Sequence, residues 1–265
     1  MSYLHTYAEG EQARLQRQAE LIQPLLYEGW EVIGSPESIL EIGCGVGSQL
    51  GFLHKRYPQA RLVGVDRSPQ QLATARQRLS QEIELVEAMG ESLPFDTHSF
   101  DFVCLYWVLE HVPDPEPILE EIARVLKPGG WVCFSEVHNP SLYLYPPCPQ
   151  AMHFWRAYNQ LQTDLGGNPE VGVQLPYLAT RQGWRIQHFC TFSPNLHGHI
   201  LDPHLREELV QFWLDLMASS LEQLEANGRE HPPFASVEAE LRRLVDEPRA
   251  VIDYQARQLL AQSPC

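Results

Sequence analysis

The feature that most constrains the fold is the stretch ILEIGCGVGSQ at residues 39–49, which places three glycines at every second position after a short apolar run. Gly43, Gly45 and Gly47 follow a predicted strand and precede the helical pattern SQLGFLHKRY. A strand that runs through such a turn into a helix brings a ligand against main-chain atoms at the edge of a parallel sheet. The stretch therefore predicts an α/β fold with a ligand at this turn.

Strand-like and helix-like segments alternate through the first half of the chain. RLVGVD at 61–66 is short and rich in β-branched residues, and the helical pattern after it begins with Ser68 as N-cap and Pro69 at the first position. The alternation continues to about residue 137. Strands alternating with helices of this length indicate βαβ units and a parallel sheet with helices on both faces.

The pattern is less regular after residue 138, where NPSLYLYPPCPQ contains four prolines and excludes a long helix. Further elements are expected as a helix containing Phe154, Trp155, Tyr158 and Leu161, helices at about 173–182, 203–226 and 236–246, and a strand at 185–192. Periodicity leaves AVIDYQARQLLAQ ambiguous. We expect one domain over 1–265, with a helical lid at 1–30, a cofactor-binding core at 35–138, and helical cap insertions over the substrate at 139–182 and 195–247.

Charge and composition exclude several classes of function. The formal net charge of −15 repels phosphate backbones, so nucleic acid is a poor candidate partner. The first residues lack the basic and apolar segments of a signal peptide, and the longest apolar run, FVCLYWVL, is too short to cross a bilayer. We expect a cytoplasmic protein without membrane insertion. The six cysteines form no C-x-x-C pair, so we expect reduced thiols and no metal site.

Two acidic residues flank the glycine stretch. Asp66 ends the next predicted strand, 23 residues after Gly43, where a carboxylate can bind both ribose hydroxyls of a nucleoside. Glu41 lies two residues before Gly43 and would repel a pyrophosphate but attract a cation. The dinucleotide motif G-x-G-x-x-G would also need glycine where Ser48 stands. These residues favour a positively charged nucleoside.

Four motifs in order resemble the class I S-adenosylmethionine-dependent methyltransferases, and in particular the UbiE-like, type 11 branch that modifies small molecules. They are LEIGCGVG, GVDRSP, ESLPFDTHSFDFV and VLEHVPDPEPILEEIARVLKPGGW, within about residues 35–137. The resemblance implies a Rossmann-like seven-stranded sheet of order 3-2-1-4-5-7-6 with an antiparallel seventh strand. That strand would be AVIDYQARQLLAQ, although composition alone favours a helix there.

The resemblance also implies S-adenosyl-L-methionine as cofactor and a set of residues that bind it. Glu41, Gly43, Cys44 and Gly45 would line its methionine part, Asp66 would hold the ribose, and Arg67 would lie beside the adenine. Some relatives have a Tyr/Arg-bearing helix over the cofactor carboxylate, which suggests Tyr7 and Arg14 here; a solvated helix arginine is the alternative for Arg14.

Adenine recognition departs from the usual pattern of the family. In the segment that ends in Leu-Pro-Phe, relatives usually read Asp-Ala-Glu-x-Leu-Pro-Phe, and the Asp binds the adenine amino group. This chain has Met89, Gly90 and Glu91 in place of the first three residues. Met89 can pack on the adenine face but accepts no hydrogen bond from the amino group. We expect main-chain atoms at 89–90 or Glu91 to replace the aspartate.

Candidate residues for chemistry follow the fourth and fifth predicted strands. Glu110 and His111 are the nearest candidate bases, and His138 is another; bracing of the next helix and an ordinary surface histidine are the alternatives. Tyr106 and Trp107 are placed to border the sulfonium or the acceptor, or to pack in the core. Aromatic residues Tyr143, Tyr145 and Trp155 suggest a lid over an apolar acceptor.

Methyl transfer from a sulfonium needs mainly the alignment of acceptor and methyl group, with a base where the acceptor must lose a proton. The sequence therefore predicts in-line methyl transfer to O, N or C of a small, apolar or aromatic metabolite. The alternative is a non-catalytic nucleoside-binding sensor or scaffold of the same fold. A nicotinamide-dependent oxidoreductase is disfavoured by Ser48 and Glu41. The oligomeric state is left open.

Overall fold

The computed structural model describes residues 18, 19, 21–27, 30–193 and 195–265. Seven strands form one sheet of order β3-β2-β1-β4-β5-β9-β7. Their bounds are β1 Ser38–Ile42, β2 Arg61–Asp66, β3 Glu84–Glu87, β4 Phe100–Tyr106, β5 Leu126–Glu136, β7 Arg185–Phe192 and β9 Ala256–Gln262. Counted within this sheet, β7 is sixth and β9 seventh, so the predicted strand order is confirmed.

The sheet is parallel from β3 to β5 and antiparallel at its other edge. β9 pairs antiparallel with both β5 and β7. The ambiguous segment at 250–262 is thus confirmed as the closing strand, preceded by the short β8 Val251–Asp253. Ala256, Leu259, Leu260 and Ala261 of β9 are all buried. A strand buried between two others has no polar face, which is why its sequence lacks strict alternation.

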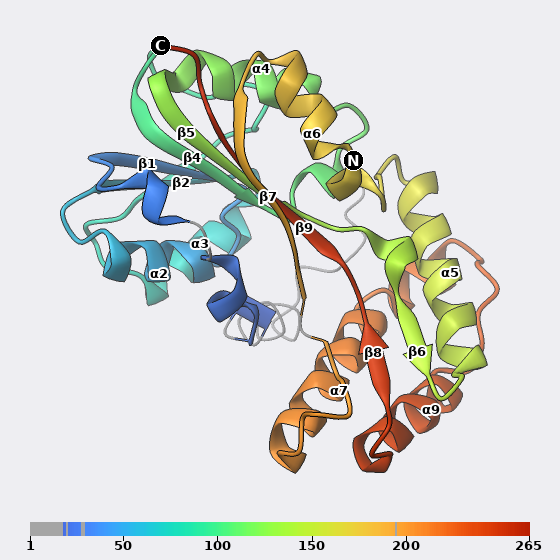
Figure 1. The fold of residues 1–265 in the computed structure, drawn as a ribbon. Coiled ribbons are helices and arrows are strands. Elements are labelled where there is room, and N and C mark those ends of the chain that lie inside the picture. The colour runs from blue at the N-terminus through green and yellow to red at the C-terminus, as the bar shows by residue number, and fades with distance from the viewer. Residues whose placement is uncertain (1–17, 20, 28–29, 194) are drawn as a thin grey trace.

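Successive side chains of the central strands enter two different cores. Ile39 and Phe102 face the core that contains residues of α2 Ser48–Arg56 and α3 Pro69–Arg78. Leu40 and Val103 face the core that contains residues of α4 Glu116–Val125 and α6 Val171–Arg181. Figure 1 shows α4 and α6 on one face of the sheet and α2 and α3 on the other.

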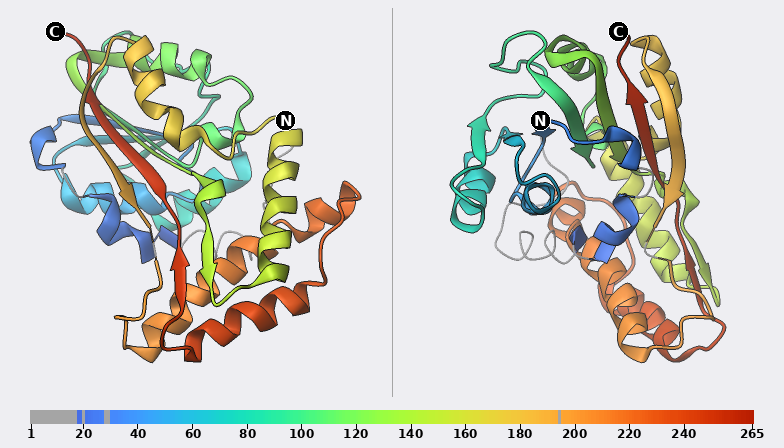
Figure 2. Two further views of the ribbon diagram at one scale, coloured as in Figure 1. Left: turned by 45° about the vertical axis from the view of Figure 1, so that its right-hand side comes forward. Right: turned by 60° about the vertical axis from the view of Figure 1, so that its left-hand side comes forward.

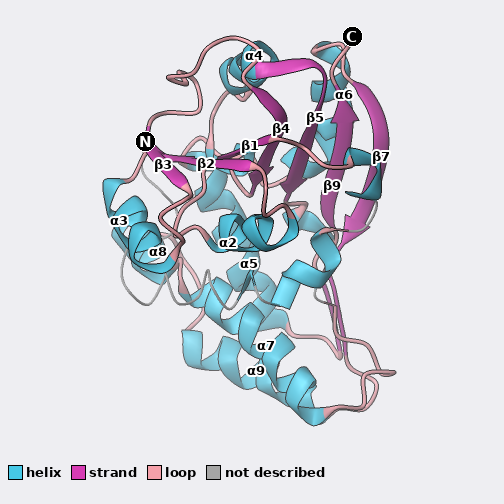
Figure 3. Cartoon of the chain, turned by 90° about the vertical axis from the view of Figure 1, so that its left-hand side faces the viewer, coloured by secondary structure: helices cyan, strands magenta, loops and turns pink. Residues whose placement is uncertain are grey.

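A group of helices lies beyond one end of the sheet (Figures 1 and 2). These helices are α5 Pro149–Asp164, α7 Pro203–Ala218, α8 Leu221–Ala226 and α9 Phe234–Asp246. α9 packs on α5 and α7, and α5 packs on α7 and α8. Beside them, β6 Tyr143–Tyr145 and β8 form a two-stranded antiparallel ribbon. Figure 3 shows α7 and α9 at the end of the molecule farthest from the sheet.

The segments predicted as lid and cap do not all lie among the helices beyond the sheet. α6 falls within 139–182 but packs against β5, β7 and β9. Most of the lid at 1–30 lies outside the described residues, although Ile22 and Leu26 of its described part are buried in the core on the α2 side. The division into core, lid and cap remains a prediction. No helix among the described residues has the length and apolar character to cross a bilayer.

Three short 3-10 helices also occur in the described part of the chain: η1 Trp30–Ile33, η2 Leu109–His111 and η3 Asn139–Ser141. η2 and η3 directly follow β4 and β5, so they lie at the carboxyl edge of the sheet. This edge is where ligands bind in open parallel sheets.

Gly64 in β2 provides a test of the packing beneath the glycine turn. A methyl group there would press on Leu50 Cδ1 and lie 2.9 Å from Cys44 Sγ and 3.0 Å from Leu85 Cδ2. We expect Gly64→Ala to lower the free energy of unfolding by about 1–3 kcal/mol, measured by urea denaturation. Gly51→Ala is the control, because its methyl group meets only Leu79 Cδ2, at 3.3 Å. Equal midpoints for the two variants would contradict this account.

Candidate ligand-binding and active site

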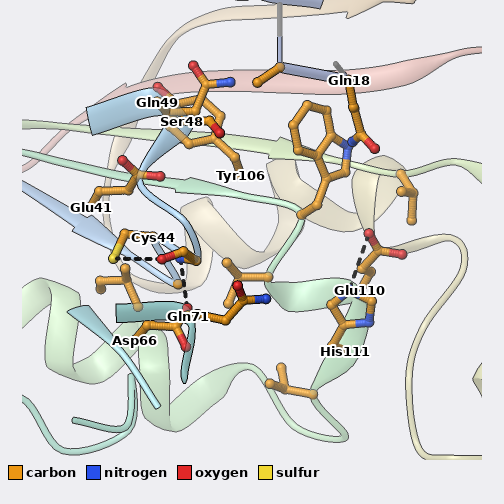
Figure 4. Close-up of a pocket in the computed structure, with 18 of the residues that line it drawn as sticks. Gln18, Glu41, Cys44, Ser48, Gln49, Asp66, Gln71, Tyr106, Glu110 and His111 are labelled. Carbon is orange, nitrogen blue, oxygen red and sulfur yellow. Dashed lines mark hydrogen bonds and ion pairs between the residues drawn. The ribbon is translucent and has the colours of Figure 1, made fainter. Parts of the chain in front are cut away.

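A cavity of about 240 Å³ lies at the carboxyl edge of β1, β2 and β4. Its lining comes from the glycine turn, the end of β2, residues 88–91, the segment after β4, and the helices beyond the sheet. Figure 4 shows part of this lining, with Glu41, Cys44 and Asp66 on one side and Glu110 and His111 on the other. The cavity thus has two sides. The glycine turn, the end of β2 and residues 88–91 form the side where the sequence predicts a nucleoside, called here the nucleoside side, and residues that follow β4 form part of the other side.

The glycine turn needs its glycines for two separate reasons. Gly43, Gly45 and Gly47 have φ angles of 72°, 51° and 77°, a region that other residues seldom adopt. A methyl group on Gly43 would also collide with the side chain of Val108, whereas one on Gly45 would meet no heavy atom within 4 Å. The first glycine thus lets the segment after β4 approach closely, and the second leaves open space beside the cavity.

Two carboxyl groups lie beneath this turn. Asp66 accepts hydrogen bonds from the backbone N–H groups of Gly45 and Ser68, each at 2.8 Å. Glu41 is 3% exposed, and its Oε2 has no hydrogen-bond partner among the described residues. Burial, followed by the charge of Asp66, raises the pKa of Glu41 well above its usual value, and burial also raises the pKa of Asp66. Burial makes the ionised form of both acids costly, and a positively charged ligand would stabilise that ionised form.

The residues predicted to hold the cofactor come together around this cavity. Tyr7 and Arg14 lie outside the described residues. The other ten all line it: Glu41, Gly43, Cys44, Gly45, Asp66, Arg67, Met89, Gly90, Glu91 and Tyr106. Met89 is 48% exposed, so its side chain is accessible to a flat group bound beside it. The set fits S-adenosylmethionine, since it combines an open main-chain turn, a strand-end aspartate and a buried acid.

Glu110 and His111, the predicted bases, both line the cavity from η2. Glu110 is 5% exposed and accepts a 2.6 Å hydrogen bond from Gln162 Nε2. Its other oxygen lies 3.7 Å from His111 Nε2. A buried carboxylate held at the cavity wall is suited to accept a hydrogen bond or a proton from a bound molecule.

His138, also predicted as a base, does not line the cavity, although Val137 and Asn139 on either side of it do. Successive side chains point in opposite directions where the chain leaves a strand, so His138 is directed away. Its pKa is lowered, mainly by burial and then by the charge of Arg257. We therefore leave His138 out of the site that we propose.

The aromatic residues predicted for the substrate side divide into two groups. Trp107 and Trp155 line the cavity. Tyr143 and Tyr145 do not: they lie in the β6–β8 ribbon, 57% and 44% exposed, while Leu144 between them is buried. Alternation along β6 turns both tyrosines outward, and we leave them out of the proposed site as well.

Trp107 has an unusual backbone at the point where the two sides of the cavity meet. Its φ angle is 56°, although it is a bulky residue that disfavours the left-handed region. Its N–H donates to the carbonyl of Ser135 at 2.9 Å, and its ring lies 6.3 Å from that of Phe192. Strained backbone of this kind is found at ligand sites, where neighbouring structure holds it in place.

Sequence reasoning missed much of the lining on this side. The additional aromatic residues are Tyr158, Phe192, Phe212, Trp213 and Tyr254. Tyr158, Phe212 and Trp213 are visible in the sequence as parts of helical apolar stripes, but such stripes do not distinguish a core from a cavity wall. Asn139 and Gln162 carried no signal in the sequence.

Glu136 is a buried acid behind the part of the cavity wall that follows β4. It is fully buried, and its carboxylate accepts hydrogen bonds from the N–H groups of Val108 (3.0 Å), Leu109 (2.8 Å) and Glu110 (3.3 Å). Burial, followed by the charge of Glu110, raises the pKa of Glu136 to about 8. Glu136 thus holds η2, and with it Glu110, against the end of β5.

This shift makes the stability of the protein depend on pH. A carboxyl group whose pKa is higher in the folded state favours folding below its unfolded pKa, and this contribution is lost as the pH rises to about 8. The contribution of this group to the free energy of unfolding falls by about 1.4 kcal/mol per pH unit between about pH 5 and pH 8. We expect urea denaturation to show a smaller loss over this range for Glu136→Gln than for the wild type. The raised pKa values of Glu41 and Asp66 also make stability fall as the pH rises, and they do so in both proteins. Parallel curves of unfolding free energy against pH would therefore refute the role of Glu136.

Comparisons with known proteins give the family. Residues 40–134 match a family described as a methyltransferase domain. An uncharacterized methyltransferase of Schizosaccharomyces pombe is 33% identical over 189 residues, covering 67% of this chain and 65% of that protein. A demethylmenaquinone methyltransferase of Lactococcus lactis is 37% identical over 113 residues, covering 41% of this chain and 45% of that protein. The chain thus spans about half to two thirds of the length of these two relatives.

Solved structures support the fold. The structure of the [4+2]-cyclase SpnF aligns with a TM-score of 0.55 at 20% identity, and the alignment covers 94% of this chain and 81% of the SpnF chain. The geranyl diphosphate C-methyltransferase of Streptomyces coelicolor A3(2) has a TM-score of 0.55 at 16% identity, covering 92% and 77%. Together with the strand order and the glycine turn, these likenesses show the fold of the class I S-adenosylmethionine-dependent methyltransferases, and residues 40–134 match the methyltransferase domain family.

Proposed function

We propose that the chain transfers the methyl group of S-adenosylmethionine to a small, apolar or aromatic molecule. The observation that supports this most is the buried Glu41 carboxyl beside Asp66, beneath a turn whose Gly45 leaves open space. Two acids with raised pKa values make a site that gains stability when a cation binds. A sulfonium nucleoside carries such a charge.

The residues of the chain would share the binding of this cofactor. Asp66 is placed to bind the ribose hydroxyls while it holds Gly45, and Glu41 attracts the positively charged part. Arg67, Met89, Gly90 and Glu91 border the adenine end. When bound, S-adenosylmethionine supplies a methyl group that is already activated by the positive charge on sulfur.

The other side of the cavity supports an apolar or aromatic acceptor. Trp107, Trp155 and Trp213 line it, and aromatic walls exclude water and align a flat molecule. Two relatives have names that refer to quinones: the demethylmenaquinone methyltransferase of Lactococcus lactis, and a ubiquinone biosynthesis O-methyltransferase of Nitrosomonas europaea that is 34% identical over 125 residues, covering 43% of this chain and 51% of that protein.

Asp66 provides the first test. We expect Asp66→Ala to weaken the binding of S-adenosylhomocysteine by about 5- to 150-fold, because charge-assisted hydrogen bonds are lost and Gly45 is released. Isothermal titration calorimetry measures this change. Glu87→Gln is the control, since Glu87 ends the neighbouring strand β3, is exposed and does not line the cavity. Absence of binding by the wild-type protein would overturn the proposed function.

Gly45 provides a second test, directed at the open space. Gly45→Ala and Gly34→Ala both place a methyl group on a glycine of positive φ, 51° and 70°, with no heavy atom within 4 Å. Both variants should lose about 1 kcal/mol of stability from backbone strain. Only Gly45→Ala should also lower S-adenosylhomocysteine affinity, by about tenfold or more, because Gly34 is remote from the cavity. Equal affinities would show that no ligand approaches Gly45.

A turnover assay separates an enzyme from a non-catalytic binder. Radiolabelled S-adenosylmethionine is incubated with the protein and a mixture of small phenols, amines and quinols. Labelled product shows transfer, whereas binding of the donor without labelled product from any of these compounds would favour the sensor or scaffold.

A further inference from the structure

Six aromatic residues form one end of the cavity, called here the aromatic end: Trp155, Tyr158, Phe192, Phe212, Trp213 and Tyr254. Five of the rings pack on one another, and the ring of Phe192 lies 6.3 Å from that of Trp107. Trp155 stacks on Tyr158 at 4.7 Å and meets Trp213 edge-on at 5.7 Å, and Trp213 meets Tyr254 at 5.1 Å. The helices and the strand that supply them are packed together, so the aromatic end is a preformed wall.

The wall is less polar than its composition suggests. The indole N–H of Trp155 donates to the carbonyl of Asn139 at 2.8 Å, and the hydroxyl of Tyr254 donates to Asn139 Oδ1 at 2.9 Å. Both groups are therefore satisfied within the protein. The indole N–H of Trp213 has no hydrogen-bond partner among the described residues but is buried, so a ligand at this end meets mainly ring carbon, which favours flat apolar groups.

Glu110 is the charged group that borders the aromatic end. The other charged residues among the described lining are Glu41, Asp66, Arg67 and Glu91, and all of them belong to the glycine turn, the end of β2 or residues 88–91. Figure 4 shows Glu110 across the cavity from Glu41 and Asp66. A molecule held against the aromatic end therefore meets one carboxylate at its border.

A chain of buried hydrogen bonds holds this carboxylate in place. Tyr254 donates to Asn139, Asn139 Nδ2 donates to Gln162 Oε1 at 3.0 Å, and Gln162 Nε2 donates to Glu110 Oε2 at 2.6 Å. All four residues are less than 9% exposed. The backbone of Glu110 is held separately by Glu136. Glu110 is thus positioned from two directions, as a group with a defined partner in the cavity would be.

We propose that the aromatic end binds an uncharged aromatic ring bearing a hydroxyl or amino group, that this group donates a hydrogen bond to Glu110, and that Gln162 positions the carboxylate for it. The proposal rests on the proposed function and deepens it, since it assigns transfer to O or N. A carboxylate offers about four acceptor sites, so Glu110 can accept a hydrogen bond from this group as well as from Gln162.

The charge and the chemistry of the site agree on this class of acceptor. Glu110 repels carboxylates and phosphates, and aromatic walls cannot replace the water that an anion loses. Phenols and aromatic amines are uncharged near pH 7 and still carry a proton. Glu110 receives that proton as the bond from oxygen or nitrogen to hydrogen is replaced by a bond to the methyl carbon, while the electron pair of the broken carbon–sulfur bond stays on sulfur.

The first experiment measures ring binding without turnover. Calorimetry of the full chain saturated with S-adenosylhomocysteine compares phenol, aniline, toluene, benzoate and benzylamine at pH 7.5. We expect phenol and aniline to bind roughly tenfold or more tightly than toluene, because toluene cannot donate a hydrogen bond to Glu110, and benzoate to bind most weakly. Benzoate binding as well as phenol, or protonated benzylamine binding more tightly than phenol, would overturn the proposal.

Glu110→Gln tests the assigned residue. The amide keeps the size and can still accept from Gln162, so S-adenosylhomocysteine affinity should be unchanged, which also shows that the variant folds. The preference for phenol over toluene should fall to about threefold or less, and benzoate should bind more tightly than in the wild type. Glu120→Gln, on the exposed surface of α4, is the matched control and should behave as the wild type. A phenol preference that survives in Glu110→Gln would exclude Glu110 as the acceptor.

Gln162→Met tests positioning through a pH profile. Phenol binding should weaken as the pH falls and Glu110 takes up a proton. Without the amide donor the ionised carboxylate is less stabilised, so the midpoint of this loss should move to higher pH. His111, Glu136 and Tyr254 also face Glu110 and are unchanged in the variant. An unshifted midpoint would remove Gln162 from the proposal.

The outcomes also separate this inference from the proposed function. If the wild-type protein does not bind S-adenosylhomocysteine, the proposed function fails. If it binds that ligand but shows no preference for phenol over toluene, or methylates carbon in the turnover assay, only the present inference fails.

Discussion

The carbonyl of Val65 accepts hydrogen bonds from the backbone N–H groups of both Gly43 and Cys44, at 2.7 and 2.9 Å. The next residue, Asp66, accepts one from Gly45. These three bonds fasten the glycine turn after β1 to the end of β2. The nucleoside side of the cavity depends on them, because they hold open main chain beside two acids.

The acceptor side depends on a different carboxylate. Glu136, at the end of β5, accepts the N–H groups of three successive residues after β4 and so fixes η2. Val108 in this segment also packs against Gly43. The two sides are therefore mechanically joined, because the glycine turn and the segment that carries Glu110 contact each other. Such contact is suited to holding a donor and an acceptor in line, which is the main requirement of methyl transfer.

The residues assigned to the nucleoside side lie together around the cavity because they are local in the sequence, while their binding roles stay a prediction. Glu41, Gly43 and Gly45 lie within one strand and its turn, and Asp66 ends the next strand, so parallel pairing brings them together. Much of the aromatic lining on the other side was not named from the sequence, because its residues come from segments that are far apart. Tyr254 reaches Asn139 across 115 positions, and Gln162 reaches Glu110 across 52. Tyr143 and Tyr145 had the composition of a lid, but the pairing of β6 with β8 turned them outward.

The sequence by itself determined the α/β class, the glycine turn and the acids beside it, because strand alternation, positive φ and strand-end carboxylates leave local signatures. It also indicated the closing strand, but only through resemblance, since a strand buried on both faces has no pattern of its own. The tertiary structure alone decided which aromatic residues form the wall and which side chains hold Glu110 beside it. Those choices depend on how α5, α7 and the segment before β9 pack together, and packing between distant segments follows from shape and burial rather than from any local pattern.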